Sequence, residues 1–389
     1  MHPGFLPPSF LRPPDGGRRR LMTLELRNVT KRVGAETHIY ETNLVLPDNS
    51  LNVLLGATLA GKTTLMQLMA GLDTPTSGEI WFRGKNVTGV PVQKRNVSMV
   101  YQQFINYPNL TVEDNIATPL RVAGFDKSVI ASRVGRAAEL LRLTPMLKRR
   151  PSELSGGQQQ RTAIARAIVK DSDVILFDEP LANLDYKLRE ELRDELPKLF
   201  AERNCVVVYA TSEPSEALLF GGNTATLEKG RVTQFGPTAE GYRRPRDIVS
   251  AEVFSDPPIN THSAVKEGKS FVLAEKDPGG KGKPHRITIP VPQHLAGVAD
   301  GPVTLGVQPH HLSLEEPFEK APALKVRTQV SEIAGSESFV HVLFGDKRWV
   351  MLAHGVCNLD PELDIDIHLD TRHLMAFGAD GTSLSRNAG

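Results

Sequence analysis

Residues 56–64 are Gly-Ala-Thr-Leu-Ala-Gly-Lys-Thr-Thr and fit the pattern G-x-x-x-x-G-K-[ST]. The apolar run Leu51–Leu55 before them predicts a buried strand, and Leu65–Ala70 after them predicts the start of a helix. A glycine-bearing loop between a strand and a helix directs backbone N–H groups and the positive end of the helix toward an anion. The segment therefore predicts an α/β fold organised around a phosphate-binding loop.

Two side chains of this loop have specific expected tasks. Lys62 is expected to reach the β- and γ-phosphates of a nucleotide, and the Thr63 hydroxyl is expected to ligate Mg²⁺. The alternative explanation is a glycine turn that precedes a helix by chance. The residues predicted to bind the nucleotide are Gly56, Ala57, Thr58, Leu59, Ala60, Gly61, Lys62, Thr63 and Thr64.

Composition limits the classes of protein that fit. At 389 residues the chain is too long for one ordinary domain, so two are expected. The 46 basic and 45 acidic residues leave a net charge of +1, which does not favour a nucleic-acid partner. Only two cysteines occur, so no disulfide framework is implied, and no apolar run approaches the length of a membrane span.

The first 21 residues lack periodic apolar patterning. They contain five prolines and the triplet Arg18–Arg20, and we expect a disordered tail, or a start codon upstream of a working start at Met22. A basic anchor is the alternative for this tail. From Met22 the pattern alternates between strands and helices, and the stretch from 102 to 168 is expected to be a helical insertion.

A pair of carboxylates follows a second buried strand. Asp173–Phe177 is a short apolar run typical of a central parallel strand, and Asp178 and Glu179 stand at its carboxyl end. In a phosphate-loop protein Asp178 would hold Mg²⁺ and Glu179 would orient or deprotonate the attacking water. An ordinary acidic turn before Pro180 is the alternative.

Leu154-Ser-Gly-Gly-Gln158 resembles the signature of the ATP-binding cassette (ABC) family. The chain resembles the ATPase subunit of ABC importers of the maltose and glycerol-phosphate type, from about Met22 to the C-terminus. The family's parts occur in order: phosphate loop, glutamine Gln102, signature, the pair Asp178-Glu179, and a D-loop at 182–185. The resemblance implies binding and hydrolysis of ATP with Mg²⁺.

The resemblance also assigns roles to residues outside the phosphate loop. Gln102 would sense the γ-phosphate or Mg²⁺, and Ser155 fits the N-cap of the helix that follows. In the family this loop binds the γ-phosphate held by an opposing subunit, so two cassettes face head to tail. The residues implied to serve the opposing site are Ser155, Gly156, Gly157 and Gln158.

A further aromatic segment follows Gln102. Phe104 and Tyr107 resemble the part of the family that receives a helix of the membrane subunit. That both are core residues is the alternative.

Three positions depart from the family pattern. Ser212 stands where the family has the switch histidine, and a serine cannot carry positive charge. Val33 stands where an aromatic usually stacks on adenine, so that stacking is lost or is supplied by Tyr40 or His38. Leu59 replaces a glycine. All three lie in the part of the nucleotide site that this chain's own phosphate loop forms, whereas its signature is intact. We therefore expect pairing with a second, non-identical ATPase subunit. A working homodimer is the alternative.

The C-terminal part has a different pattern. Past about Pro245, short β-like runs separated by turn residues predict a small all-β barrel. The run Leu305–Leu312 resembles the oligonucleotide-fold regulatory domain of carbohydrate importer ATPases, although Gln308 replaces an arginine. His310 and His311 are candidate ligands, with surface turn histidines as the alternative. The expected divisions are a tail 1–21, an ATPase domain 22–244 and a barrel 245–389.

These observations predict the ATPase subunit of an importer for a sugar, a polyol or a glycerol phosphate. The resemblance implies two membrane permeases as partners, an extracytoplasmic solute-binding protein indirectly, and a peripheral position at the cytoplasmic face of the inner membrane. Two other classes remain open: a soluble ABC ATPase of DNA repair or translation, and an ATP-binding regulatory subunit with little hydrolysis. Neither tandem cassettes nor long coiled-coil insertions, expected of the soluble class, are present.

Overall fold

The structure is a computed structural model and describes residues 23–48, 50–182, 184–201, 204–277, 281–385. The tail predicted for residues 1–21 and Asn183 of the predicted D-loop lie outside the described residues. Two compact units divide the chain between Thr238 and Ala239. Among the described residues, no helix is both long and apolar enough to cross a membrane.

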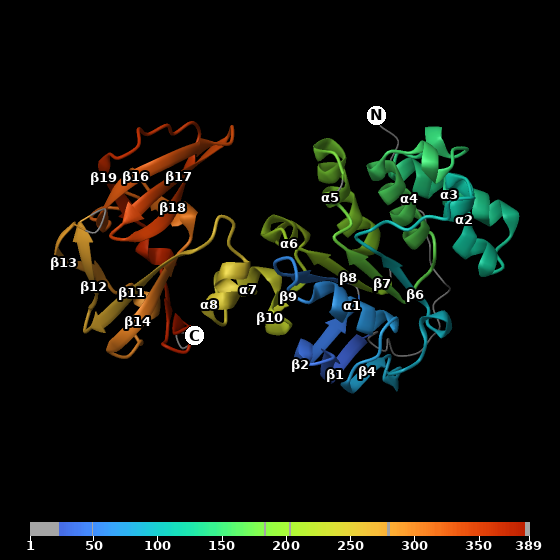
Figure 1. The fold of residues 1–389 in the computed structure, drawn as a ribbon, viewed down its shortest axis with the longest axis horizontal. Helices are drawn as coiled ribbons and strands as arrows, with labels where there is room; N and C mark the ends of the chain where they lie inside the picture. Colours follow the sequence, from blue (N-terminus) through green and yellow to red (C-terminus); the bar gives the residue numbers. More distant parts are fainter. Residues whose placement is uncertain (1–22, 49, 183, 202–203, 278–280, 386–389) are drawn as a thin grey trace, which may run out of the picture. The chain divides into compact units, whose positions relative to one another are not determined.

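The first unit contains two sheets (Figure 1). The larger has the order β10-β9-β3-β8-β7-β6, in which β10 is the antiparallel edge strand and the rest are parallel. Its strands are β3 Leu51–Leu55, β6 Val97–Val100, β7 Val174–Asp178, β8 Val206–Thr211, β9 Asn223–Glu228 and β10 Arg231–Pro237. Strands β3, β7 and β8 are buried along their whole length, as expected of central strands covered on both faces.

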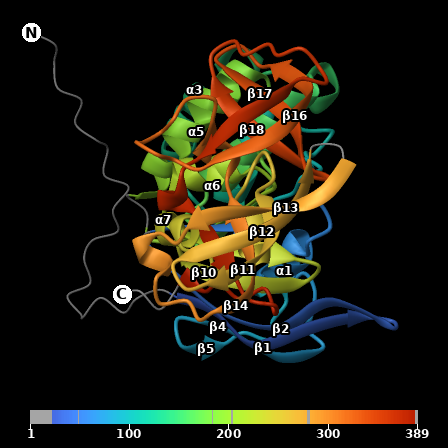
Figure 2. The same cartoon turned by 90° about the vertical axis from the view of Figure 1, so that its left-hand side faces the viewer.

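The smaller sheet is antiparallel and has the order β2-β1-β4-β5. Its strands are β1 Thr23–Val33, β2 Glu36–Pro47, β4 Ser77–Phe82 and β5 Lys85–Asn86. Residues 38–40 and 44–46 both belong to the single long strand β2. Figure 2 shows β1 and β2 side by side at one edge of the unit.

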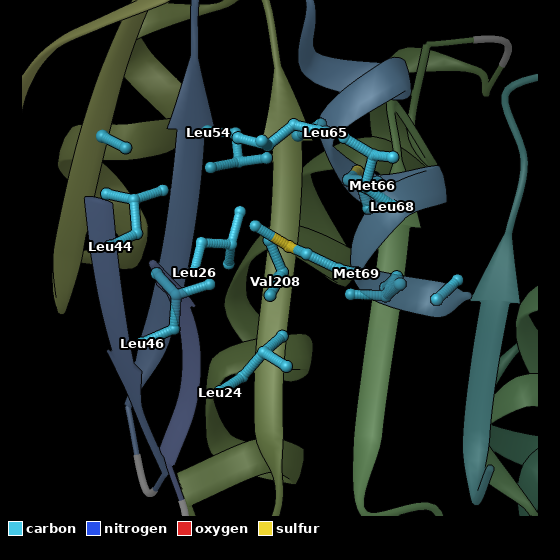
Figure 3. Close-up of a cluster of buried hydrophobic side chains, with 14 of the residues drawn as sticks. Leu24, Leu26, Leu44, Leu46, Leu54, Leu65, Met66, Leu68, Met69 and Val208 are labelled. Carbon is cyan, nitrogen blue, oxygen red and sulfur yellow. The ribbon is translucent and has the colours of Figure 1, made fainter. Parts of the chain in front are cut away.

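A shared apolar core joins the two sheets to helix α1 (Lys62–Ala70). Leu24 and Leu26 of β1 and Leu44 and Leu46 of β2 face Leu54, Val208 and the buried side of α1 (Figure 3). Their alternation of buried and exposed positions is typical of strands with one buried face. This core holds the start of α1, and with it the phosphate loop, against the parallel sheet.

The remaining helices of the first unit lie mostly after β6. Part of the expected insertion is helical, although residues 103–110 are not. The helices are α2 Val112–Val122, α3 Lys127–Leu140, α4 Gly156–Ile168, α5 Tyr186–Ala201, α6 Pro214–Phe220 and, at the boundary of the two units, α7 Thr238–Arg243.

The second unit is all-β apart from short helices, as its sequence pattern predicted. Two five-stranded antiparallel sheets, β13-β12-β11-β14-β20 and β15-β19-β16-β17-β18, share one apolar core. The strands are β11 Asn260–Glu267, β12 Ser270–Asp277, β13 Lys281–Pro290, β14 Gly301–Val307, β15 Leu312–Ser313, β16 Ala323–Ile333, β17 Glu337–Phe344, β18 Lys347–His354, β19 Asp364–Leu369 and β20 Met375–Phe377; helix α8 Ile248–Val253 precedes them.

Candidate functional site

The phosphate loop connects the carboxyl end of β3 to the first turn of α1. Gly61 has a φ of +104° and directly precedes Lys62, the first residue of α1. Gly56 packs so closely that a Cβ there would lie 2.4 Å from the carbonyl oxygen of Leu227. Leu59 also has a positive φ, +69°, and its side chain is 94% exposed. The loop therefore has the left-handed residues that turn its backbone, and one of them is not glycine.

Lys62 is buried inside this loop. Its ammonium group donates hydrogen bonds to the carbonyl oxygens of Gly56, at 2.7 Å, and Ala57, at 3.1 Å. The same nitrogen lies 3.1 Å from a carboxylate oxygen of Glu179. The loop thus places a positive charge beside the N-terminus of α1, where an anionic phosphate is stabilised.

Asp178 ends strand β7 and is only 2% exposed. The Thr63 hydroxyl donates to Asp178 Oδ2 at 2.7 Å. Burial raises the pKa of Asp178, and the nearby charge of Glu179 adds to the increase, while Thr63 and Lys62 oppose it. A buried carboxylate beside a hydroxyl is a poorly solvated oxygen pair, which a cation would stabilise.

Gln102 and Glu179 lie beside Lys62, Thr63 and Asp178. Gln102 follows β6, and its amide nitrogen donates to Glu179 Oε2 at 3.0 Å. Glu179 has a φ of +45°, and its N–H donates to the carbonyl oxygen of Ala210 at 3.0 Å. The structure therefore brings five predicted residues together at the carboxyl ends of neighbouring parallel strands: Lys62, Thr63, Gln102, Asp178 and Glu179.

The donor set fits Mg²⁺. This ion prefers hydroxyl, carboxylate and amide oxygens. Thr63 and Asp178 offer the first two, and the amide oxygen of Gln102 is a third candidate.

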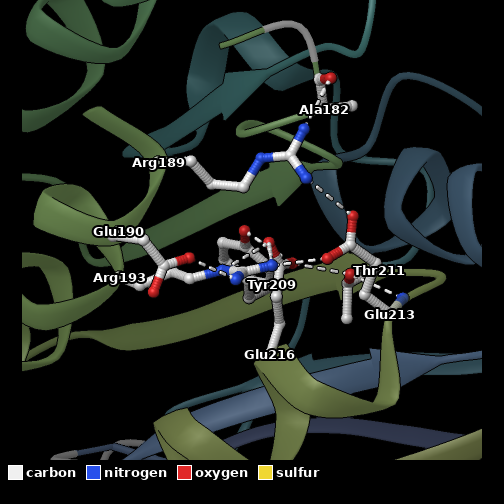
Figure 4. A network of polar contacts seen from close by, with 8 residues as sticks. All are labelled: Ala182, Arg189, Glu190, Arg193, Tyr209, Thr211, Glu213 and Glu216. Atoms are coloured by element: carbon white, nitrogen blue, oxygen red, sulfur yellow. Dashed lines mark hydrogen bonds and ion pairs between the residues drawn. The ribbon is translucent and has the colours of Figure 1, made fainter. Parts of the chain in front are cut away.

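Ser212 directly follows strand β8 and is exposed. A polar network holds the backbone on both sides of it (Figure 4). Glu216 is 4% exposed and accepts from Thr211 Oγ1 at 2.7 Å and from the Tyr209 hydroxyl at 3.1 Å. The N–H of Glu213 donates to Thr211 Oγ1 at 3.0 Å.

Two arginines of α5 extend this network. Arg189 contacts Glu213 at 3.1 Å and donates to the carbonyl oxygen of Ala182 at 3.1 Å. Arg193 forms ion pairs with Glu213 and Glu216. The network joins the segment after Glu179 to the segment around Ser212. These residues are not among those predicted from the sequence. The one available signal was the spacing of acidic and basic residues along α5 and α6.

The signature segment forms the start of α4. Ser155 is the N-cap: its hydroxyl accepts from the Gln158 N–H at 3.4 Å, and Gln158 Oε1 accepts from the Ser155 N–H at 3.0 Å. Gly156 and Gly157 are the first residues of the helix. The hydrogen bonds described for these four residues stay within the start of α4, so they do not join the phosphate loop of the same chain.

The position expected to stack on adenine has no aromatic side chain. Val33 ends β1 and is 52% exposed. Tyr40 is 37% exposed, and the Arg231 guanidinium carbon lies 3.5 Å from its ring centroid. Gly230 donates to the Ala60 carbonyl and accepts from the Tyr40 N–H, so the β9–β10 turn joins the loop to β2. One face of the Tyr40 ring is therefore occupied by an arginine.

The apolar side chains that follow Gln102 differ in their exposure to solvent. Tyr107 is 49% exposed and Ile105 is 60% exposed, whereas Phe104 is half-buried. The Arg166 guanidinium carbon lies 5.1 Å from the centroid of the Tyr107 ring. Tyr107 thus fits the expectation of an exposed anchor better than Phe104 does.

Comparison with known proteins gives consistent matches. The family described as ABC transporter matches residues 40–182. The sn-glycerol-3-phosphate import ATP-binding protein of Salmonella typhi is 37% identical over 85% of this chain and 91% of its own length. The corresponding Escherichia coli K12 protein is 36% identical with the same coverage. A dimeric ATP-binding cassette solved in a post-hydrolysis state with ADP and Pi matches with a TM-score of 0.51 and 28% identity, over 55% of this chain and 98% of that one.

Proposed function

The chain belongs to the ABC transporter family as an ATP-binding ATPase, and from this premise we propose that it powers import of a glycerol phosphate, sugar or polyol through partner membrane permeases. The observation that carries the proposal is the convergence of Lys62, Thr63, Asp178, Glu179 and Gln102 at one end of the parallel sheet. The substrate class rests on the names of the similar import proteins.

The roles of the side chains follow from their positions. Lys62 and the loop N–H groups would bind the phosphates, and Thr63, Asp178 and Gln102 would hold Mg²⁺, which neutralises phosphate charge when bound. Glu179 would orient the attacking water and accept its proton. Gln102 donates to Glu179, so it would fix the orientation of that carboxylate.

Assembly with other subunits is part of the proposed function. We infer that the signature Ser155–Gln158 completes the site of an opposing ATPase subunit, and that two permeases, with a solute-binding protein acting through them, hold the chain at the cytoplasmic face of the membrane. The hydrogen bonds that keep the signature within α4 support a role toward another chain.

A non-identical partner subunit is our preferred form of this assembly. Ser212 offers one short hydroxyl, Val33 offers no ring, and Leu59 is strained where a glycine would not be. All three weaken the half-site that this chain owns, while the signature keeps its N-cap geometry. A homodimer is the alternative that the experiment below distinguishes. The regulatory and soluble classes are not favoured, because the similar proteins are import ATP-binding subunits.

Steady-state Mg-ATP hydrolysis by the full chain, beside Glu179→Gln and Ser212→His, tests the proposal. Slow turnover that Ser212→His raises and Glu179→Gln abolishes would support a weakened catalytic site. Strong turnover that Ser212→His leaves unchanged would contradict the heterodimer. Turnover that survives in Glu179→Gln would contradict the assignment of the base. Equal ATP binding by all three proteins is the control for intact folding.

A further inference from the structure

Three potential metal-binding side chains meet in the second unit, away from the phosphate loop in sequence. His311, Asp370 and His373 each direct a donor atom into one place, and these donor atoms lie within 4.8 Å of one another. His310 and His311 are candidate ligands from the sequence alone, but the sequence indicates no further ligand beside them. The structure supplies two partners from a segment about 60 residues later in the chain.

Strand pairing explains why these distant residues meet. Strands β15 and β19 are antiparallel, with Leu312 opposite Leu369. His311 directly precedes β15 and Asp370 directly follows β19, so both lie at the same end of this strand pair. The Asp370 N–H donates to the His311 carbonyl oxygen at 2.9 Å. The cluster is thus built on a sheet register rather than on mobile surface side chains.

A short turn adds the third residue. The 3₁₀ helix η6 (Thr371–His373) folds back after Asp370, whose side chain accepts from the Arg372 N–H at its start. The rings of His311 and His373 stack with their centroids 4.0 Å apart and their planes 6° from parallel. The two imidazoles therefore lie side by side near the Asp370 carboxylate.

The environment suits ligation. Asp370 is 8% exposed, and the Arg372 guanidinium binds both of its oxygens, which fixes the carboxylate while leaving lone pairs on it. His311 is partly buried, and its carbonyl oxygen accepts from the Asp370 N–H, so the backbone on both sides of the cluster is fixed.

We propose that His311, Asp370 and His373 form a binding site for a divalent transition metal of the zinc class. Two imidazoles and one carboxylate match the ligands of Zn²⁺, Ni²⁺ or Cu²⁺ and leave a position for water, whereas Mg²⁺ and Ca²⁺ prefer all-oxygen sites. Donors about 2 Å from a tetrahedral ion lie about 3.3 Å apart, so separations of up to 4.8 Å must contract by as much as about 1.5 Å. Rotation of the exposed His373 ring supplies that contraction.

The test uses the untagged full chain, stripped with a chelator and titrated with Zn²⁺ against a chromophoric competitor. We expect one ion per chain with a dissociation constant near or below about 1 µM. His311→Asn, Asp370→Asn and His373→Asn should each weaken binding by about tenfold or more, since loss of a merely orienting group costs about 10- to 100-fold.

A matched control removes another histidine beside a carboxylate. His341 Nε2 lies 3.2 Å from Glu332 in the same unit, but among the described residues no third potential ligand joins this pair. His341→Asn should therefore bind Zn²⁺ as the unaltered chain does. Co²⁺ should give the intense visible absorption of a tetrahedral site only in proteins with all three ligands. His373 is exposed, so the substitution there leaves the core intact.

Two results would overturn the site. Zinc binding that is equally tight in His373→Asn and in the unaltered chain would place the ion elsewhere. Binding no tighter than about 100 µM in the unaltered, folded chain would mean that the three side chains do not form a metal site. Neither result would bear on ATP hydrolysis, because the cluster and the phosphate loop belong to different units.

Discussion

The Thr63 hydroxyl donates a 2.7 Å hydrogen bond to Asp178, a carboxylate that the parallel sheet almost completely buries. The first residues of α1 and the last residue of β7 are therefore joined through one side-chain contact. Since burial raises the pKa of Asp178, the protein stabilises its neutral form relative to the unfolded chain. Burial of the Asp178 carboxylate, where it can hold Mg²⁺, therefore lowers the stability of the metal-free protein when Asp178 is ionised.

This cost predicts a pH-dependent effect of Asp178→Asn. A carboxyl with a raised folded-state pKa contributes stability at low pH and loses it as the pH rises through that pKa. Asparagine mimics the neutral acid, so the variant should melt near the unaltered chain at low pH and above it at pH 8. Thermal unfolding in the presence of a chelator measures this difference, over a range from just below the ordinary carboxyl pKa of 3.8 up to pH 8.

Asp114→Asn is the matched control of opposite sign. The Arg121 guanidinium and the Thr111 hydroxyl lower the pKa of Asp114, so its ionised form stabilises the fold. The control variant should therefore melt below the unaltered chain at pH 8, with a gap that narrows only as the pH falls below the ordinary carboxyl pKa of 3.8. A constant gap for Asp178→Asn across this range would contradict the pKa direction assigned to Asp178.

Leu59→Gly should stabilise the first unit. Leu59 has a φ of +69° and is 94% exposed, so its side chain gives little packing in return for left-handed backbone strain. Relief of that strain should raise the free energy of unfolding by about 1 kcal/mol. Urea unfolding gives the value, and fluorescent-ATP titration shows whether the loop also binds nucleotide more tightly.

The same change in a helix is the control. Leu218 is an exposed residue of α6, and glycine in a helix costs about 1 kcal/mol relative to a good helix former. Leu218→Gly should therefore destabilise the unit. If both variants lost stability, Leu59 would not be strained in the way that its backbone angle indicates.

Glu216→Gln should strongly destabilise the first unit. The carboxylate is buried and accepts from Tyr209, Thr211 and Arg193, and glutamine would direct an NH₂ group at one of these donors. Breaking a buried charged network of this kind costs about 2–4 kcal/mol. Fluorescence of Trp81 during urea unfolding, in a Trp349→Phe background, follows the first unit separately.

Glu213→Gln tests whether burial is the cause. Glu213 contacts Arg193 as Glu216 does, and also Arg189, but its side chain is 41% exposed. An exposed ion pair contributes at most about 1 kcal/mol, so this variant should lose far less stability. Similar losses in the two variants would mean that ion pairing, and not the buried hydroxyl network, dominates.

The positions of Lys62, Asp178 and Glu179 could be predicted because β3 and β7 are buried parallel strands on either side of β8, so their carboxyl ends lie at the same edge of the sheet. The N-cap at Ser155 was equally predictable, because capping depends on adjacent residues. The contacts of Arg193 with Glu213 and Glu216 were not, because they join side chains 20 or more residues apart through the packing of α5 on α6. The meeting of His311 with His373 likewise depends on the register of β15 and β19, which periodicity does not determine.

The missing adenine platform gives the last prediction. Val33 is 52% exposed, and one face of the nearby Tyr40 ring is covered by Arg231. An aromatic at position 33 would add a stacking surface worth about 1–3 kcal/mol per base. Val33→Trp should therefore bind ATP about tenfold more tightly, equivalent to about 1.4 kcal/mol.

Inorganic tripolyphosphate and a second valine make this prediction specific. Tripolyphosphate has no base, so its affinity should not change in Val33→Trp if stacking is the cause. Val45 of the neighbouring strand β2 is 54% exposed and pairs with Glu25, far along the hairpin from the turn near Val33. Val45→Trp should leave ATP binding unchanged, because a tryptophan there cannot reach the base.

An increase in tripolyphosphate affinity, or an equal gain in both variants, would mean that the new ring acts on the loop or on the fold rather than on adenine. No gain in Val33→Trp would instead mean that Tyr40 or another side chain already supplies the stacking surface.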